Sequence, residues 1–126
     1  MRFEGSISND NLLRVSGYIC KAEVKVQVDF VIDTGFADGL DVAVPADIAA
    51  SLDLEADRVI PASTASGPTK LPFGKGLKVC LGGRELEASY VITRTAYPLI
   101  SVNFLRKLSE LVIIDFEKRY VMVMLR

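Results

Sequence analysis

The stretch FVIDTGFADGL, residues 30–40, places an acidic side chain at the end of an apolar segment. From residue 24 to residue 33 apolar and polar side chains alternate, a period of two that is typical of a β-strand with one buried face. Asp33 and the Thr-Gly pair after it then interrupt this strand. Because Asp, Thr and Gly also build ordinary turns, a catalytic acid and a plain turn are both open interpretations.

The overall composition favours one soluble domain. The chain has 126 residues, the usual size of one domain, so we expect residues 1–126 to fold as a single unit. Half of the residues are hydrophobic and the mean hydropathy is +0.31, enough for a packed core. The net charge of -1 gives no electrostatic reason to bind nucleic acid or an anionic membrane. No apolar run approaches the roughly 18 residues of a membrane span, and the N-terminal stretch lacks a signal-peptide core. We therefore expect a cytoplasmic protein with no membrane partner.

The sequence contains no histidine. This excludes Ser-His-Asp triads, Cys-His dyads and histidine-based metal sites. Two cysteines, Cys20 and Cys80, are too few to ligate a structural zinc, and they are interpreted either as free thiols or as a disulfide of an oxidising compartment or a thermophile. Carboxylates, lysine or tyrosine must then carry any acid-base chemistry, and we predict neither a metal nor a cofactor.

Residues 77–92, LKVCLGGRELEASYVI, predict the clearest hairpin, with Gly82-Gly83 as a two-residue turn. That turn fixes the register of the two strands. The register sets three pairs of residues opposite one another: Leu77 with Ala88, Lys78 with Glu87, and Val79 with Leu86.

The remaining pattern is also mostly β. Residues 14–26 predict another hairpin, residues 59–76 a polar hairpin or long loop with Ser66-Gly67-Pro68 at its tip, and residues 119–125 a last strand. Short helices are predicted within 44–54, where Pro45 suits the first helical position, and within 101–111, where Ser101 suits the N-cap. These elements predict a small, closed, mostly antiparallel β-barrel with one or two short helices.

Residues 30–54 resemble the active-site loop of retropepsin-like (clan AA) aspartic peptidases, especially the cellular, single-domain microbial members. The resemblance continues through TASG, residues 64–67, at the place of the family's flap, and through the closing segment of residues 97–123. It spans about residues 12 to 124. It implies a retropepsin-like barrel that hydrolyses peptide bonds.

The resemblance also implies a mechanism with two carboxyl groups that share one proton and hold a water molecule. At about 3 Å and an effective dielectric constant near 20, two such charges repel by roughly 5 kcal/mol, so one group stays protonated. The chain has one Asp-Thr-Gly, and the resemblance therefore implies a homodimer in which Asp33 of each subunit forms half of the dyad. Thr34 would hydrogen-bond across the two-fold axis, and Gly35 would let the substrate backbone approach. Asp115 is the alternative partner within one chain.

The substrate-binding residues implied by the resemblance are Phe36, Ala37 and Asp38 after the motif and Ser66 and Gly67 in the flap. The flap of the family closes over an extended peptide or protein substrate. Phe36 stands where retropepsins usually have Ala or Ser, and Asp38 is offset from the usual substrate-anchoring acid.

Ser101 stands where the family usually has a glycine turn. Serine would be strained there if the turn needs a positive φ, and it would be favourable if the residue is the helix N-cap. The apolar stretch of residues 121–125 is either a strand shared between two subunits or an internal strand.

Three functions remain open at this point. The first is a homodimeric aspartic endopeptidase. The second is a catalytically weak or inactive retropepsin-like module for peptide binding or assembly, and the third is an unrelated β-barrel with a chance Asp-Thr-Gly turn.

Overall fold

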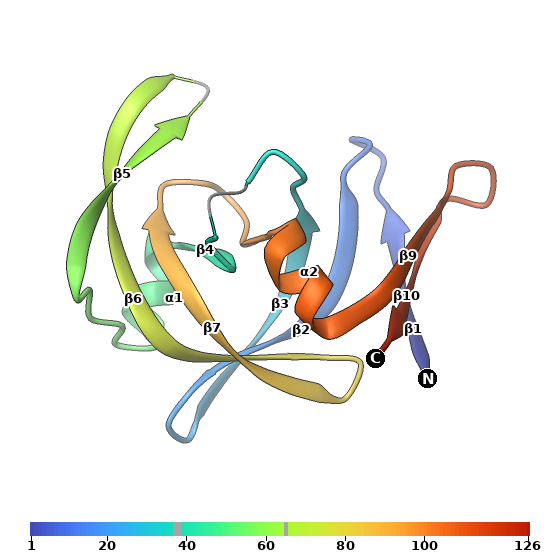
Figure 1. Ribbon diagram of the computed structural model, residues 1–126, viewed down its shortest axis with the longest axis horizontal. Coiled ribbons are helices and arrows are strands. Elements are labelled where there is room, and N and C mark those ends of the chain that lie inside the picture. Colours follow the sequence, from blue (N-terminus) through green and yellow to red (C-terminus); the bar gives the residue numbers. More distant parts are fainter. Residues whose placement is uncertain (37–38, 65) are drawn as a thin grey trace.

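The computed structural model describes residues 1–36, 39–64 and 66–126. These residues form ten strands and two short helices (Figure 1). The strands are β1 (Arg2–Ile7), β2 (Leu13–Lys21), β3 (Val24–Ile32), β4 (Val42–Pro45), β5 (Arg58–Thr64), β6 (Gly67–Leu81), β7 (Arg84–Thr93), β8 (Leu99–Ile100), β9 (Ser109–Asp115) and β10 (Tyr120–Leu125). The helices are α1 (Ala46–Ser51) and α2 (Val102–Leu108).

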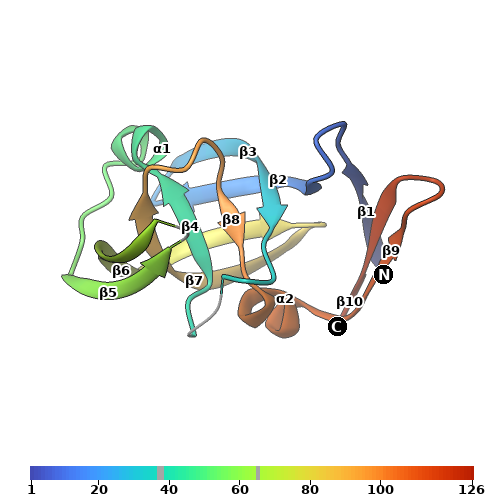
Figure 2. The same ribbon diagram turned by 90° about the horizontal axis from the view of Figure 1, so that it is seen from above.

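Six of these strands close into a barrel. The ring runs through β6, β7, β4, β8, β3 and β2, and it closes where β2 pairs with β6. Most neighbours are antiparallel, whereas β3 with β8 and β4 with β7 are parallel. Figure 2 shows β4, β8 and β3 side by side in one wall. The predicted fold, a closed and mostly antiparallel barrel with two short helices, is confirmed.

The hairpin of β6 and β7 has the predicted register. Gly82 and Gly83 have φ values of 58° and 82°, as a two-residue turn of this kind requires. The first half of β6 pairs with β5 instead, so one long strand serves both the barrel and a projecting hairpin. The predicted pairs are all present: Leu77 with Ala88, Lys78 with Glu87, and Val79 with Leu86.

Both helices lie where the sequence places them. Pro45 is the N-cap of α1 rather than its first helical residue. Ser101 caps α2: its φ is -87° and its hydroxyl accepts the Phe104 N–H at 3.1 Å. The strained-turn alternative for Ser101 is therefore wrong. Leu105 and Leu108 of α2 are buried, and they join the core that fills the barrel.

Three strands form a sheet that extends beyond the barrel. β1 pairs with β2 over only two residues before it diverges, and β10 and then β9 follow it to the edge (Figure 1). Residues 121–125 were predicted to be either a strand shared between subunits or an internal strand. In the single chain, β10 is an internal strand between β1 and β9. The edge strand is β9, which the sequence pattern did not single out, and β1 was also missed.

Candidate active site

Asp33 lies directly after β3, at the point where the strand ends. Its N–H donates to the Ile100 carbonyl of β8 at 3.1 Å, so the parallel β3–β8 ladder continues to the acid itself. The Gly35 N–H donates to Asp33 Oδ1 at 2.9 Å. A Cβ atom at position 35 would lie only 3.3 Å from the same oxygen, which explains why glycine suits this place. The loop thus places one half-buried carboxyl group directly after the last residue of β3.

Within the described residues, the Gly35 amide is the one hydrogen-bond partner of the Asp33 side chain. Asp115, the alternative partner, lies at the end of β9, where its Oδ1 accepts the Lys118 N–H in the hairpin turn at 2.9 Å. The Asp115 carboxylate therefore accepts a hydrogen bond in a turn, and no hydrogen bond joins it to Asp33 in the part of the chain that the structure describes.

The return of the active-site loop is anchored by Asp41, a residue that the sequence analysis missed. Its carboxylate is buried, and it accepts hydrogen bonds from the Ser89 N–H of β7 at 2.9 Å and from the Asn103 amide of α2 at 2.8 Å. Lys107, one helical turn further along α2, lies 3.0 Å from Asp41 Oδ1. Two features of the sequence could have indicated this anchor. Asp41 is an acid directly before an apolar strand, and Asn103 and Lys107 are hydrogen-bond donors four residues apart, on one face of a helix.

Ser101 fixes the loop a second time. Its hydroxyl donates to the Leu40 carbonyl at 2.6 Å while it accepts the Phe104 N–H, and its own N–H donates to the Asp41 carbonyl at 3.0 Å. A glycine at this position could not make these two side-chain hydrogen bonds, because it has no hydroxyl. The serine that replaces the usual glycine thus connects α2 to the loop that carries Asp33.

Phe36 joins the loop to the projecting hairpin. Its half-buried ring packs against a small apolar cluster that is separate from the main core. The cluster includes Ile60 of β5 and Leu71 of β6, so both arms of the hairpin contact the same group of side chains as the loop after Asp33. The loop and the hairpin therefore pack against one shared cluster. Ala37 and Asp38, the next predicted substrate residues, lie outside the described residues.

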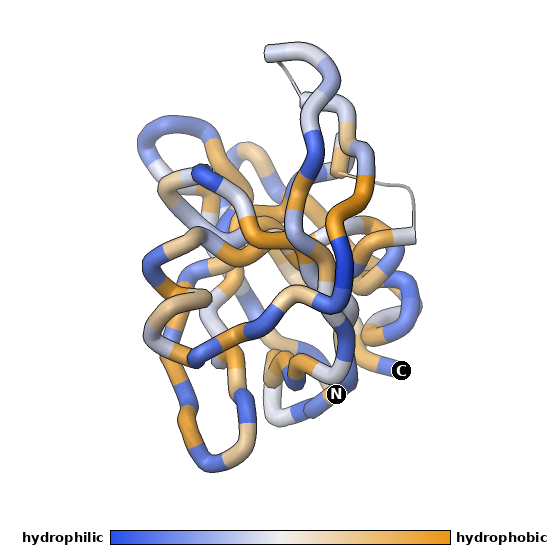
Figure 3. Tube along the Cα trace, turned by 90° about the vertical axis from the view of Figure 1, so that its left-hand side faces the viewer, coloured by the Kyte–Doolittle hydropathy of each residue, from blue (hydrophilic) through white to orange (hydrophobic). Residues whose placement is uncertain are grey.

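The hairpin of β5 and β6 carries the predicted flap residues at its tip. Thr64 pairs with Gly67, whose φ is 109°, and the exposed Ser66 donates its N–H to the Thr64 hydroxyl at 3.2 Å. The tip projects away from the barrel and carries no strongly hydrophobic residue among those described (Figures 1 and 3). A projecting hairpin with a polar tip is the kind of element that can act as a movable cover.

Thr34 is exposed and lines a shallow groove next to the motif. The groove is bordered by α2 and by β9. Its lining is mostly apolar: Leu13, Ile32, Val102, Leu105, Leu111, Val112 and Ile114, with Ser109, Glu110, Arg106 and Arg126 at polar positions. The residue after Asp33 therefore borders a mostly apolar groove.

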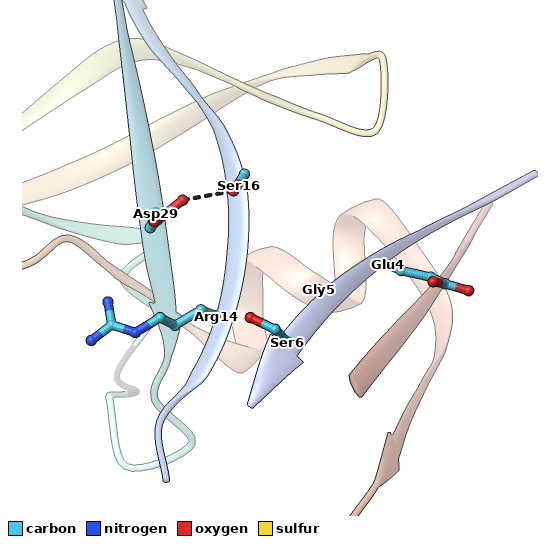
Figure 4. A pocket seen from close by; sticks show the side chains of 6 residues that line it. All are labelled: Glu4, Gly5, Ser6, Arg14, Ser16 and Asp29. Atoms are coloured by element: carbon cyan, nitrogen blue, oxygen red, sulfur yellow. Dashed lines mark hydrogen bonds between the residues drawn. The ribbon is translucent and has the colours of Figure 1, made fainter. Parts of the chain in front are cut away.

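A second hollow lies where β1 diverges from β2 (Figure 4). Ser16 donates to Asp29 there at 2.6 Å, and Glu4 points away from Arg14. None of these polar side chains hydrogen-bonds to Asp33, whose side chain is bonded only to the Gly35 amide among the described residues. In the described part of the chain no three His, Cys, Asp or Glu side chains gather as a metal site requires. Cys20 and Cys80 are free thiols, and burial raises the pKa of Cys20.

Comparison with solved structures identifies the class of fold. The retropepsin-like aspartic protease from Rickettsia conorii superposes with a TM-score of 0.73 at 16% identity, covering 98% of this chain and 90% of that one. The protease of simian foamy virus (mac) superposes with a TM-score of 0.56 at 16% identity, covering 74% of this chain and 91% of that one. No family model and no curated protein matches the sequence. The fold is retropepsin-like.

Neither α1 nor α2, the helices of the described residues, has the length or the apolar character needed to span a membrane.

Proposed function

We propose that the protein is a homodimeric aspartic endopeptidase in which Asp33 of each subunit supplies one carboxyl group of a shared dyad. The observation that carries the proposal is the position of Asp33. It follows β3 at the rim of a retropepsin-like barrel, with one carboxylate oxygen held by the Gly35 N–H and no carboxyl partner among the described residues. A second molecule supplies the group that the chain lacks.

The proposed chemistry needs no metal or cofactor. Two carboxyl groups about 3 Å apart cannot both ionise, because their repulsion amounts to roughly 5 kcal/mol at an effective dielectric constant near 20. The ionised group takes a proton from the bound water, which attacks the peptide carbonyl, and the protonated group donates its proton to the carbonyl oxygen. The tetrahedral diol then collapses: one of its hydroxyl groups returns a proton to the ionised carboxyl group, the other carboxyl group protonates the amide nitrogen, and the C–N bond breaks. The pair titrates as a unit, and activity is expected from acidic to near-neutral pH.

The proposed substrate is a peptide or protein segment in extended conformation, bound between the Asp33 loop and the β5–β6 hairpin. Gly35 leaves room for the substrate backbone beside the carboxyl group, and the exposed tip at Ser66 and Gly67 closes over the peptide. Because Phe36 packs into the cluster at the base of the hairpin, its ring limits the size of the substrate side chain that this end of the cleft accepts. The assignments of Ala37 and Asp38 to substrate binding remain predictions.

Replacement of Asp33 by Asn tests the proposal. The Asn side chain has the same size and cannot serve as the ionised base, so peptide cleavage is expected to fall by at least about 10²-fold. Digestion of a diverse peptide pool, followed by mass spectrometry, measures the loss, and Asp29→Asn on the same strand is the matched control. Cleavage by the Asp33→Asn protein at the parent rate would refute the dyad. No cleavage by the parent at any pH would favour a module that binds peptides without cutting them.

A further inference from the structure

β9 has the sequence of an internal strand, although it lies at the edge of the sheet. Residues 111–114 are four consecutive apolar residues. In the ladder with β10, Leu111 and Ile113 lie on one face with the methionines of β10, whereas Val112 and Ile114 lie on the other face with buried valines. Strands that are apolar on both faces are typically covered on both sides and paired on both edges.

The outer edge of β9 pairs with no other strand among the described residues. Leu111, Ile113 and Ile114 remain exposed, and so does Phe116 in the turn after the strand. A long apolar edge of this kind promotes association with another strand unless something covers it. Monomeric proteins usually blunt such edges with lysine, proline or a bulge. Residues 111–114 contain neither lysine nor proline, and the register shift in the β9–β10 ladder lies before them, where Leu125 pairs with Ser109.

This edge is continuous with the active-site motif. Thr34 lines one groove together with Val102 of α2 and with Leu111 and Ile114 of β9. A molecule seated on β9 in this groove therefore reaches the residue next to Asp33. The molecule that would supply a second carboxyl group to Asp33 and the strand that would cover the edge of β9 therefore approach the same side of the chain.

The charges around the groove suit a second copy of the same chain. Two exposed basic residues, Arg106 and Arg126, and the exposed acidic Glu110 line the groove. A two-fold axis brings the same patch of each copy against the other, so a patch with both signs is complementary to itself. Two copies of one edge strand related by such an axis pair in antiparallel orientation.

We propose that two copies of the chain dimerise by antiparallel pairing of β9 with β9, with α2 and the groove around Thr34 packed against the same axis. The inference rests on the proposed function for its choice of a second copy as occupant. It assigns the shared strand to residues 109–115, whereas the C-terminal strand β10 stays inside each subunit.

Leu111→Lys tests this surface. Sedimentation is expected to show the parent as a dimer and the variant as a monomer at the same micromolar concentration, because the lysine would lie in the paired strands. Val24→Lys is the control, since Val24 is an exposed strand residue of nearly equal exposed fraction, 49% against 51% for Leu111, on a hairpin away from the groove. A folded Leu111→Lys protein that dimerises like the parent, or a parent that stays monomeric, overturns the proposed surface.

Disulfide trapping tests the same surface without introducing a charged side chain. The four single variants Leu111→Cys, Val112→Cys, Ile113→Cys and Ile114→Cys are oxidised mildly, and peptide mapping locates any bond between subunits. One of them is expected to crosslink to its own position, because a two-fold axis within residues 111–114 sets one residue opposite its own equivalent and pairs the others with different residues. Absence of such a bond in all four overturns the pairing. Asp33→Asn is then combined with the cysteine variant that crosslinks. If the combined variant still crosslinks but no longer cleaves peptides, both the β9 interface and the Asp33 dyad are supported. If it crosslinks and still cleaves peptides, the dyad is refuted and the interface stands.

Discussion

The carboxylate of Asp41 lies 3.0 Å from the ammonium group of Lys107, and the two residues differ sharply in exposure. The Asp41 side chain is 4% exposed, whereas that of Lys107 is 47% exposed. A buried carboxylate therefore depends on a cation that reaches it from the surface of α2. Since Asp41 ends the loop that begins at Asp33, this pair connects the helix to the candidate active site.

Lys107→Met is predicted to lower the free energy of unfolding by about 1–3 kcal/mol. Loss of one partner of a fully buried ion pair costs about 3–5 kcal/mol, but Lys107 is half exposed, and Ser89 and Asn103 still donate to Asp41. The expected loss of unfolding free energy is therefore the smaller one, about 1–3 kcal/mol, of a buried carboxylate that loses one of its donors. Urea unfolding of Lys107→Met and of Lys118→Met, an exposed lysine in a turn, measures the difference. Equal stability of the two variants contradicts the role given to the pair.

Ser101→Ala is predicted to cost more than the loss of an ordinary helix cap. Removal of an N-cap hydroxyl costs about 1 kcal/mol. The same hydroxyl also donates to the Leu40 carbonyl, and a buried acceptor left without its donor adds about 1–3 kcal/mol. The sum, about 2–4 kcal/mol, can be measured by urea unfolding. Ser51→Ala, which removes an exposed hydroxyl near the end of α1, should change stability by less than about 0.5 kcal/mol. A cost of 1 kcal/mol or less for Ser101→Ala would mean that the contact with Leu40 contributes nothing.

The elements that local sequence determines were predicted well. The register of the β6–β7 hairpin follows from the Gly82-Gly83 turn, because a two-residue turn fixes which residues face each other. The N-cap of α2 follows from the chemistry of one serine. The alternation up to Asp33 likewise predicted where β3 ends and where the acid stands.

Contacts between distant segments were not predictable in the same way. Asp41 and Lys107 are 66 residues apart, and no local pattern joins them. β9 and β10 are both short and apolar, so the sequence cannot tell which of them occupies the sheet edge. That choice depends on the pairing of β1 with β10, which brings together the two ends of the chain (Figure 1).

Tyr90 gives the molecule a predicted loss of stability at alkaline pH. Its hydroxyl donates to the Glu55 carbonyl at 2.7 Å, and burial, followed by the negative charges of Asp57 and Glu55, raises the pKa of Tyr90. Between the ordinary tyrosine pKa of about 10 and the raised value, the unfolded chain loses a proton that the folded chain keeps, so stability falls as pH rises. Tyr90→Phe should be less stable than the parent at pH 8, by about 0.5–1.5 kcal/mol for the lost hydrogen bond, and the gap should narrow above pH 10. Urea unfolding of both proteins from pH 8 to pH 11 makes the comparison, because the two proteins differ only at residue 90. A gap that stays constant over this range would show that the folded protein does not hold the Tyr90 proton more tightly than the unfolded chain does.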